Sequence, residues 1–70
     1  MNKPRFTKIL GKNIRNLRES KKMTQEQVAA SGIDVKQYQR IERGLVNPTA
    51  YTLYLLSRVL ECNLDELMPD

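Results

Sequence analysis

The long hydrogen-bonding side chains between Ser31 and Gly44 are the residues of this sequence best suited to binding a ligand. The stretch SGIDVKQYQRIERG opens with a turn signal, ends on a glycine and reads between them as a helix of about ten residues. Five of its positions carry long polar side chains: Lys36, Gln37, Gln39, Arg40 and Arg43. Arginine and lysine hydrogen-bond guanine, and glutamine hydrogen-bonds adenine, at the base edges of the DNA major groove. The stretch therefore suggests duplex DNA as a ligand.

The polar and apolar residues of this stretch separate when the helix is drawn at about 100° per residue. Tyr38 and Ile41 lie on one side, and Leu45, just beyond the helix end, is expected to join them in the core. The opposite side holds Lys36, Gln39, Arg40 and Arg43, with Val35 and Gln37 flanking. A solvated helix face usually mixes acids with bases, whereas this outward strip has no acid. The pattern favours nucleic-acid contact over simple solvation.

Composition excludes several classes of protein. Seventy residues suffice for one small domain, and no apolar run approaches the ~20 residues that cross a bilayer. The start lacks the apolar stretch of a signal peptide, and the single cysteine fits a reducing cytosol, so a cytoplasmic protein is expected. Histidine is absent and the serines have no base to activate them, so neither an enzyme nor a metal or cofactor site is predicted. No small-molecule substrate is expected.

Charge divides the chain into two halves. Residues 1–43 hold eleven basic and four acidic side chains, a net charge of +7. Residues 44–70 hold one basic side chain, Arg58, and four acidic ones, a net charge of −3. The asymmetry is consistent either with a side that faces a polyanion or with ordinary solubilising charge.

Apolar spacing and capping signals predict five helices and no strand, an all-α fold. The first helix is expected from about Thr7 to Lys21, behind a basic arm at residues 1–6, and the domain spans residues 7–70. Capping residues open the next four helices, and they are Thr24, Asp34, Thr49 and Asn63. A short capped helix, a tight turn with a glycine and a polar second helix make a helix-turn-helix.

The order of these segments resembles the Cro and phage-repressor type helix-turn-helix family, often described as Xre-like. The resemblance runs through LGKNIRNLRESKKMTQEQVA, GIDVKQYQRIERGLVNPT and LDEL, from Leu10 to Leu67. It implies a compact five-helix, lambda-repressor-like domain that binds duplex DNA as a homodimer and usually represses transcription. Only Ala30 and Ser31 separate TQEQVA from Gly32, one residue fewer than is common in the family, so the second helix is expected to be shorter or to end in a 3₁₀ turn.

The resemblance also assigns roles to individual residues. It implies base contacts from Lys36, Gln37 and Arg40, with Val35 against a thymine methyl group. It implies a contact to the DNA backbone from Gln25, with Arg43 and Asn47 as further backbone contacts. Thr24 and Gln39 are also expected to contact the backbone, Thr24 because free N–H groups at a helix start attract phosphate. For Glu42 it suggests an ion pair with Arg18 that orients the recognition helix, although a carboxylate beside the binding face would otherwise repel DNA.

The carboxy-terminal part is expected to form the dimer interface. Leu53, Leu56 and Leu60 share a stripe that should face the core. The residues expected at the interface are Tyr54, Leu55, Leu64, Leu67 and Met68. Stacking of Tyr51 or Tyr54 on bases, and contact of Lys3, Arg5 and Lys8 with DNA, remain alternatives to packing and to a solvated tail. Cys62 is expected to be a core thiol rather than a redox sensor.

A sequence-specific transcriptional regulator that acts as a repressor is thus the first interpretation of the chain. A DNA-binding antitoxin, with a toxin protein on the acidic half, is the alternative from another class. A controller protein of a restriction–modification system is a variant of the first interpretation. A toxin gene beside this one would favour the antitoxin.

Overall fold

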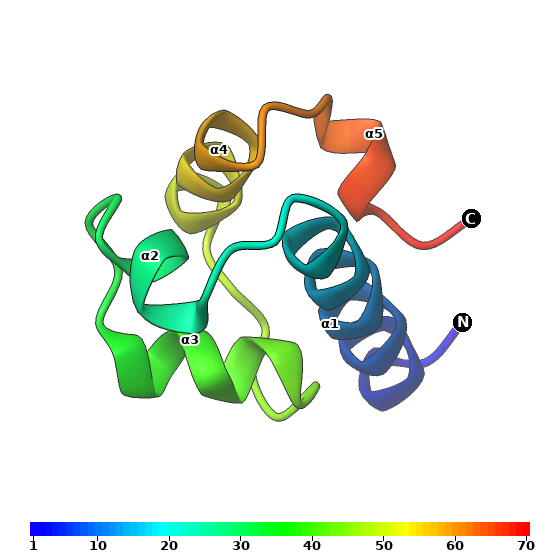
Figure 1. Cartoon of the computed structure of the whole chain (residues 1–70). Helices are drawn as coiled ribbons and strands as arrows, with labels where there is room; N and C mark the ends of the chain where they lie inside the picture. The colour runs from blue at the N-terminus through cyan, green and yellow to red at the C-terminus, as the bar shows by residue number, and fades with distance from the viewer.

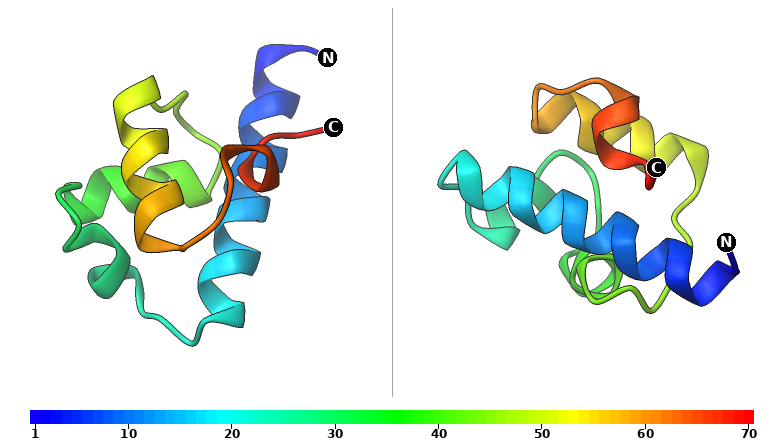
Figure 2. Two further views of the ribbon diagram at one scale, coloured as in Figure 1. Left: turned by 90° about the horizontal axis from the view of Figure 1, so that it is seen from above. Right: turned by 90° about the vertical axis from the view of Figure 1, so that its right-hand side faces the viewer.

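The computed structural model describes all 70 residues and contains five helices and no strand, which confirms the all-α prediction (Figure 1). The helices are α1 (Lys3–Ser20), α2 (Gln25–Ala29), α3 (Val35–Glu42), α4 (Ala50–Val59) and α5 (Leu64–Leu67). α1 packs against α3 and α5, α2 packs on α3, and α4 packs against α5. The right-hand view of Figure 2 shows α3 on one side of α1 and the α4–α5 pair on the opposite side. None of the helices is both long enough and apolar enough to cross a membrane.

The predicted capping residues are confirmed at the start of α2, α3 and α4. Thr24 and Gln27 form a reciprocal capping box, because each side chain accepts the backbone N–H of the other residue, at 3.1 and 2.8 Å. Asp34 accepts the N–H of Gln37 (3.1 Å), and Thr49 caps α4 in the same way. Such caps satisfy N–H groups that have no partner inside the helix. They explain why helices as short as α2 begin at defined residues.

α1 begins at Lys3 rather than at the predicted Thr7. Asn2 accepts the N–H of Arg5 (2.9 Å), and Pro4 lies in the first turn, where its missing N–H costs no hydrogen bond. Residues 3–6, expected to be an arm ahead of the domain, are therefore the first turn of the helix. α2 has five residues, which confirms the expectation of a short second helix.

The core lies where all five helices meet. Its fully or almost fully buried side chains are Leu10, Ile14, Val28, Ala29, Tyr38, Ile41, Leu56, Leu60 and Leu67. Leu56 and Leu60 confirm the predicted stripe of α4, and Leu53 and Cys62 are partly buried against the same core. Leu45 was predicted in the core but is 63% exposed, because the chain turns at Gly44 and carries it outward.

α1 and α3 approach each other closely because Gly11 has no side chain. A Cβ atom at Gly11 would lie 2.6 Å from the carbonyl oxygen of Glu42 and nearer still to that of Ile41. Gly44 packs in the same way on the backbone of Lys8, at a positive φ of 74° that glycine adopts without strain. The hydroxyl of Thr7 donates to the Gly44 carbonyl (2.9 Å), so the loop after α3 is fixed to α1.

Gly11→Ala is expected to destabilise the protein although alanine is the better helix former. The clash is with backbone atoms, so α3 must shift, and overpacking of this kind costs about 1–3 kcal/mol. The gain in helix propensity recovers at most about 1 kcal/mol. Urea unfolding followed by circular dichroism measures the change, with exposed Lys12→Ala as the control. Equal stability of the two variants would contradict the close packing of α1 on α3.

Candidate nucleic-acid interface

The predicted base-contact residues lie on the outward side of α3. Lys36 and Arg40 are exposed, whereas Val35 and Gln37 are half-buried. On the opposite side of the helix, Tyr38 and Ile41 are 0% and 1% exposed, and they fix α3 to the core. The separation predicted from the sequence is therefore present, with two long cations free at the centre of the exposed face. Neither cation makes a side-chain ion pair, so both are available to an acceptor outside the protein.

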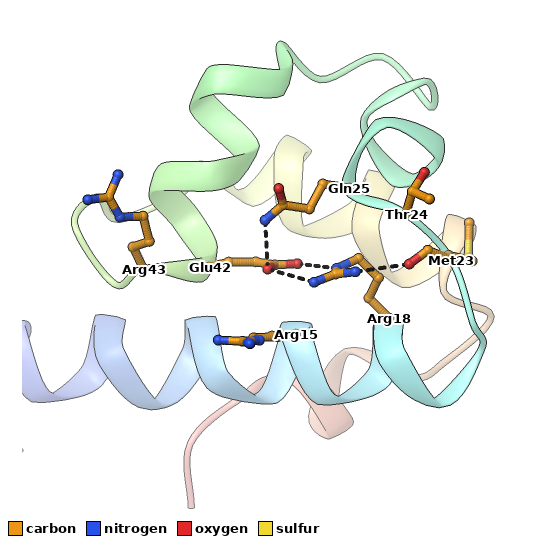
Figure 3. A pocket seen from close by; sticks show the side chains of 7 residues that line it. All are labelled: Arg15, Arg18, Met23, Thr24, Gln25, Glu42 and Arg43. Carbon is orange, nitrogen blue, oxygen red and sulfur yellow. Dashed lines mark hydrogen bonds and ion pairs between the residues drawn. The ribbon is translucent and has the colours of Figure 1, made fainter.

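α2 lies across α3, and the turn between them is set by Gly32. This glycine has a φ of 124°, in the region that L side chains rarely adopt. Val28 and Ala29 bury α2 in the core, while Thr24 and Gln25 at its start remain at least partly accessible. The start of α2 thus lies beside α3 and next to the end of α1 (Figure 3).

A buried ion pair connects α1 to α3. Arg18 donates through Nε and Nη2 to the two carboxylate oxygens of Glu42, at 2.6 and 3.2 Å, which confirms the predicted pair. The two side chains are only 13% and 4% exposed. Arg18 also donates to the Met23 carbonyl (2.9 Å), and the buried Tyr38 hydroxyl donates to Glu42. Glu42 therefore faces inward to these donors and does not oppose a polyanion at the surface.

The same carboxylate reaches a predicted DNA-backbone residue. Gln25 donates through Nε2 to Glu42 (3.1 Å), and Gln39 donates through Nε2 to the side-chain oxygen Oε1 of Gln25 (3.3 Å). Both amides are therefore oriented by hydrogen bonds inside the protein. Sequence reasoning did not find this chain of bonds, because Gln25 and Glu42 are 17 residues apart and no local pattern relates them.

These contacts shift the pKa values of Glu42, Arg18 and Tyr38. Burial raises the pKa of the Glu42 carboxyl, but the hydrogen bonds from Arg18, Tyr38 and Gln25 outweigh it, and the net pKa lies below its ordinary value. The hydrogen bond to Glu42 raises the pKa of Arg18 against the opposing effect of burial. Burial, and then the bond to Glu42, raises the pKa of Tyr38. The carboxylate is ionised and the phenol neutral at neutral pH.

An open cleft beside this network contains an arginine that the sequence analysis did not single out. Arg15 of α1 and Arg43 at the end of α3 line the cleft together with Thr24 and Gln25 (Figure 3). Arg15 is exposed and makes only an i,i+4 pair with Glu19 (3.3 Å). The only feature of the sequence that could have identified Arg15 is that it is one of several basic residues along α1. The cleft thus joins two predicted backbone-contact residues of α2 to one of α3.

A second cleft lies between the first turns of α1 and the loop that follows α3. Lys3 and Lys8 of α1 line it with Leu45 and Asn47 of the following loop. Asn47 is exposed, as a contact to DNA requires. No group of three or more histidine, cysteine or acidic side chains is placed to hold a metal ion.

The residues predicted at a dimer interface are unequally exposed. Tyr54 and Leu64 are 52% and 48% exposed, and Tyr51 beside them is 68% exposed. Leu55 and Met68 are half-buried. Leu67 was also expected at the interface, but it is fully buried in the core, so its side chain has no surface to offer a partner. The half-buried Cys62 fits a core thiol, and burial raises its pKa.

A short capped helix, a glycine turn and a second helix with an exposed basic face form a helix-turn-helix, the class of domain that the fold and this surface define. The helix-turn-helix family model HTH_3 matches residues 14–67. The chain belongs to this family, the Xre and Cro type of DNA-binding transcriptional regulators.

Known proteins agree with this assignment. An uncharacterized HTH-type transcriptional regulator of Sinorhizobium fredii (strain NBRC 101917 / NGR234), y4dJ, is 42% identical over 62 residues, which are 87% of this chain and 80% of that protein. The structure is similar to that of the restriction-modification controller protein C.AhdI from Aeromonas hydrophila, with a TM-score of 0.86 and 30% identity over 89% of this chain and 96% of that one. ComR from Streptococcus suis, at 39% identity and a TM-score of 0.83, is matched over 93% of this chain and 22% of its own.

Proposed function

We propose that this protein is a cytoplasmic, homodimeric repressor that reads a palindromic operator through the major groove. The observation that carries the proposal is the exposure of Lys36 and Arg40 on α3, opposite the buried Tyr38 and Ile41. A helix fixed to the core on one side can present its other side to base edges. The net charge of +7 in residues 1–43 supplies the attraction to phosphates.

The proposal divides the exposed residues into two groups. Lys36, Gln37 and Arg40 contact base edges, and Val35 contacts a thymine methyl group. The DNA backbone is contacted by Thr24, Gln25, Gln39, Arg43 and Asn47. Hydrogen bonds already orient the Gln25 and Gln39 amides, so their positions relative to α3 are set before DNA binds. Backbone contacts fix the position of the domain on DNA, and base contacts supply specificity.

Binding to duplex DNA is expected to weaken steeply with salt. Each neutralised phosphate contributes about −0.9 to the slope of log affinity against log salt. A dimer with about three phosphate contacts per protomer should therefore show a slope near −5. Fluorescence anisotropy across a salt series measures it, and an affinity that stays constant between low and moderate salt would contradict DNA binding through this surface.

Dimerisation follows from the small footprint of one recognition helix. A single helix reads only a few base pairs, too few for a genomic site, whereas a two-fold dimer reads two half-sites roughly 34 Å apart. The exposed apolar residues Tyr54 and Leu64 lie in the acidic half of the chain. That half has the charge expected of a surface turned away from DNA, and a second copy of the chain is its proposed occupant.

Leu64→Asp is expected to convert the dimer into a monomer. Leu64 is exposed at the first position of α5, where aspartate is compatible with a helix start, so the domain should still fold. Sedimentation velocity at tens of micromolar measures the change. Leu45→Asp, at an exposed leucine beside α3, is the matched control and should remain dimeric. A wild-type monomer that protects one asymmetric half-site would exclude the dimer.

Selection of bound sites from random duplexes tests the proposed function as a whole. Enrichment of a palindrome is expected, and enrichment of no sequence would exclude an operator-binding role. A role as a restriction–modification controller is the second candidate, favoured by the similarity to C.AhdI along almost its whole length. Restriction and methyltransferase genes beside this gene would support that role.

A further inference from the structure

Four basic side chains form a stripe along one side of α1. Arg5, Lys8, Lys12 and Arg15 recur at spacings of three, four and three residues. At about 100° per residue they fall within an arc of about 80°. All four are exposed. We refer to these four residues as the α1 basic stripe.

The packing of α1 shows which way this stripe faces. The amide of Asn13 donates to the carbonyl of Leu67 at 3.1 Å and to that of Met68 at 3.4 Å, so the Asn13 side of α1 faces the end of α5. The centre of the stripe lies about 120° around the helix from Asn13. On the longer way around the helix, from the centre of the stripe to Asn13, the first of these contacts is Gly11, which packs against α3. The stripe is therefore turned away from α5 and lies next to the α3 side of α1.

Both clefts beside α3 connect the stripe to predicted backbone-contact residues. Lys8 packs against Gly44 and lines one cleft with Asn47. Arg15 lines the other cleft with Arg43 and Gln25 (Figure 3). The stripe thus adjoins the surface at the end of α3 and along the loop that follows it, although it belongs to a helix outside the helix-turn-helix.

We infer that the α1 basic stripe binds the phosphate backbone of DNA beside the major groove that α3 enters. The inference rests on the proposed function and adds a second surface to it. Lysine and arginine bind phosphates without regard to sequence, and from Arg5 to Arg15 the helix rises about 15 Å. That length follows one strand for roughly four nucleotides at a rise of 3.4 Å each. The surface therefore adds affinity to any duplex and leaves base preference to α3.

A pair of matched lysine variants tests the inference. Lys12→Gln removes one charge from the stripe. Lys21→Gln removes one charge outside it, at the residue after the end of α1, where the Lys21 ammonium lies 3.9 Å from the Glu61 carboxylate. Anisotropy across a salt series is expected to show a slope about 0.9 smaller in magnitude per protomer for Lys12→Gln, on operator and random duplexes alike. Lys21→Gln should keep the wild-type slope.

Glu19→Gln gives an effect of opposite sign. Glu19 is the only acidic residue of α1 and pairs with Arg15, so its neutralisation should free Arg15 and tighten binding to every duplex. Glu61→Gln, which removes an exposed acid beside Lys21, is the control and should leave binding unchanged. If the wild type binds DNA but Lys12→Gln and Lys21→Gln have equal slopes, the stripe is not a binding surface. If the wild type shows no salt-dependent binding, the proposed function itself fails.

Discussion

Glu42→Ala is expected to lower the free energy of unfolding by about 3–5 kcal/mol, because it leaves the Arg18 guanidinium partly buried without its counter-charge. The same change removes the acceptor of the Tyr38 hydroxyl and of the Gln25 amide. A domain of this size has a total stability of roughly 3–10 kcal/mol, at about 0.05–0.15 kcal/mol per residue. The loss is therefore large enough to unfold a substantial fraction of the molecules. Urea titration followed by circular dichroism measures it.

Glu19→Ala is the matched control for this prediction. It also removes an acid that pairs with an arginine of α1, but here the side chains are 61% and 51% exposed. An exposed i,i+4 pair contributes only about 0.3–0.5 kcal/mol, because water and salt screen it. Similar losses in the two variants would show that the Glu42 pair behaves as a surface pair.

Acidification should remove the advantage of the Glu42 carboxylate. Its pKa in the folded protein lies below the ordinary value of 4.5, so its contribution is fully present above that pH and is lost as the pH falls through the folded pKa. The difference in unfolding free energy between wild type and Glu42→Gln should therefore be constant near neutral pH and shrink below about pH 4.5. A difference that grows on acidification would contradict the lowered pKa.

Local signals in the sequence predicted the helix starts well, since a cap involves residues within one turn of each other. Thr24 with Gln27, and Asp34 with the Gln37 backbone, form the predicted bonds. The start of α1 had the same kind of signal in Asn2 and Pro4, but the cluster of bases suggested an arm instead. The composition of a segment was a poorer guide there than its capping residues.

Exposure was harder to predict where the chain changes direction. Leu45 lies on the apolar side of α3 if the helix is extended, but the positive φ of Gly44 turns the chain before it. Leu67 was assigned to the surface because α4 alone could not bury so many apolar residues. Instead α5 folds back on α1, with Asn13 bonded to its last carbonyls, and buries Leu67. Helical periodicity carries no information about such a return.

In the candidate site, too, local patterns were predicted from the sequence and contacts made by tertiary packing were not. The outward residues of α3 followed from the helical wheel, and the Arg18–Glu42 pair followed from the family resemblance. The bonds of Gln25 to Glu42 and Gln39 join three helix positions through tertiary packing, so no spacing rule predicts them. Arg15 was overlooked because its neighbours in the cleft come from α2 and the end of α3.

Arg40 offers the sharpest test of base readout. It is exposed on the outward side of α3, one turn after Lys36, and has no ion-pair partner in the protein. A guanidinium at this place can donate to N7 and O6 of one guanine, and a bidentate contact of this kind contributes about 1–3 kcal/mol of discrimination. A palindromic operator contains the contact twice, so the effect on a dimer doubles to about 2–6 kcal/mol.

Arg40→Ala is therefore expected to weaken operator binding by that amount, to relax preference at one base pair in each half-site, and to lower binding to random duplex much less. Arg43→Ala is the matched control, because it removes the same side chain three residues later at a predicted backbone contact. It should weaken operator and random duplex by similar factors, since a phosphate contact carries no base information. Competition binding of both variants to the operator, to single-base variants of it and to random duplex separates the two roles. If Arg40→Ala lowered all of these affinities equally, Arg40 would be a backbone contact, and the base preference of α3 would have to come from Lys36 and Gln37.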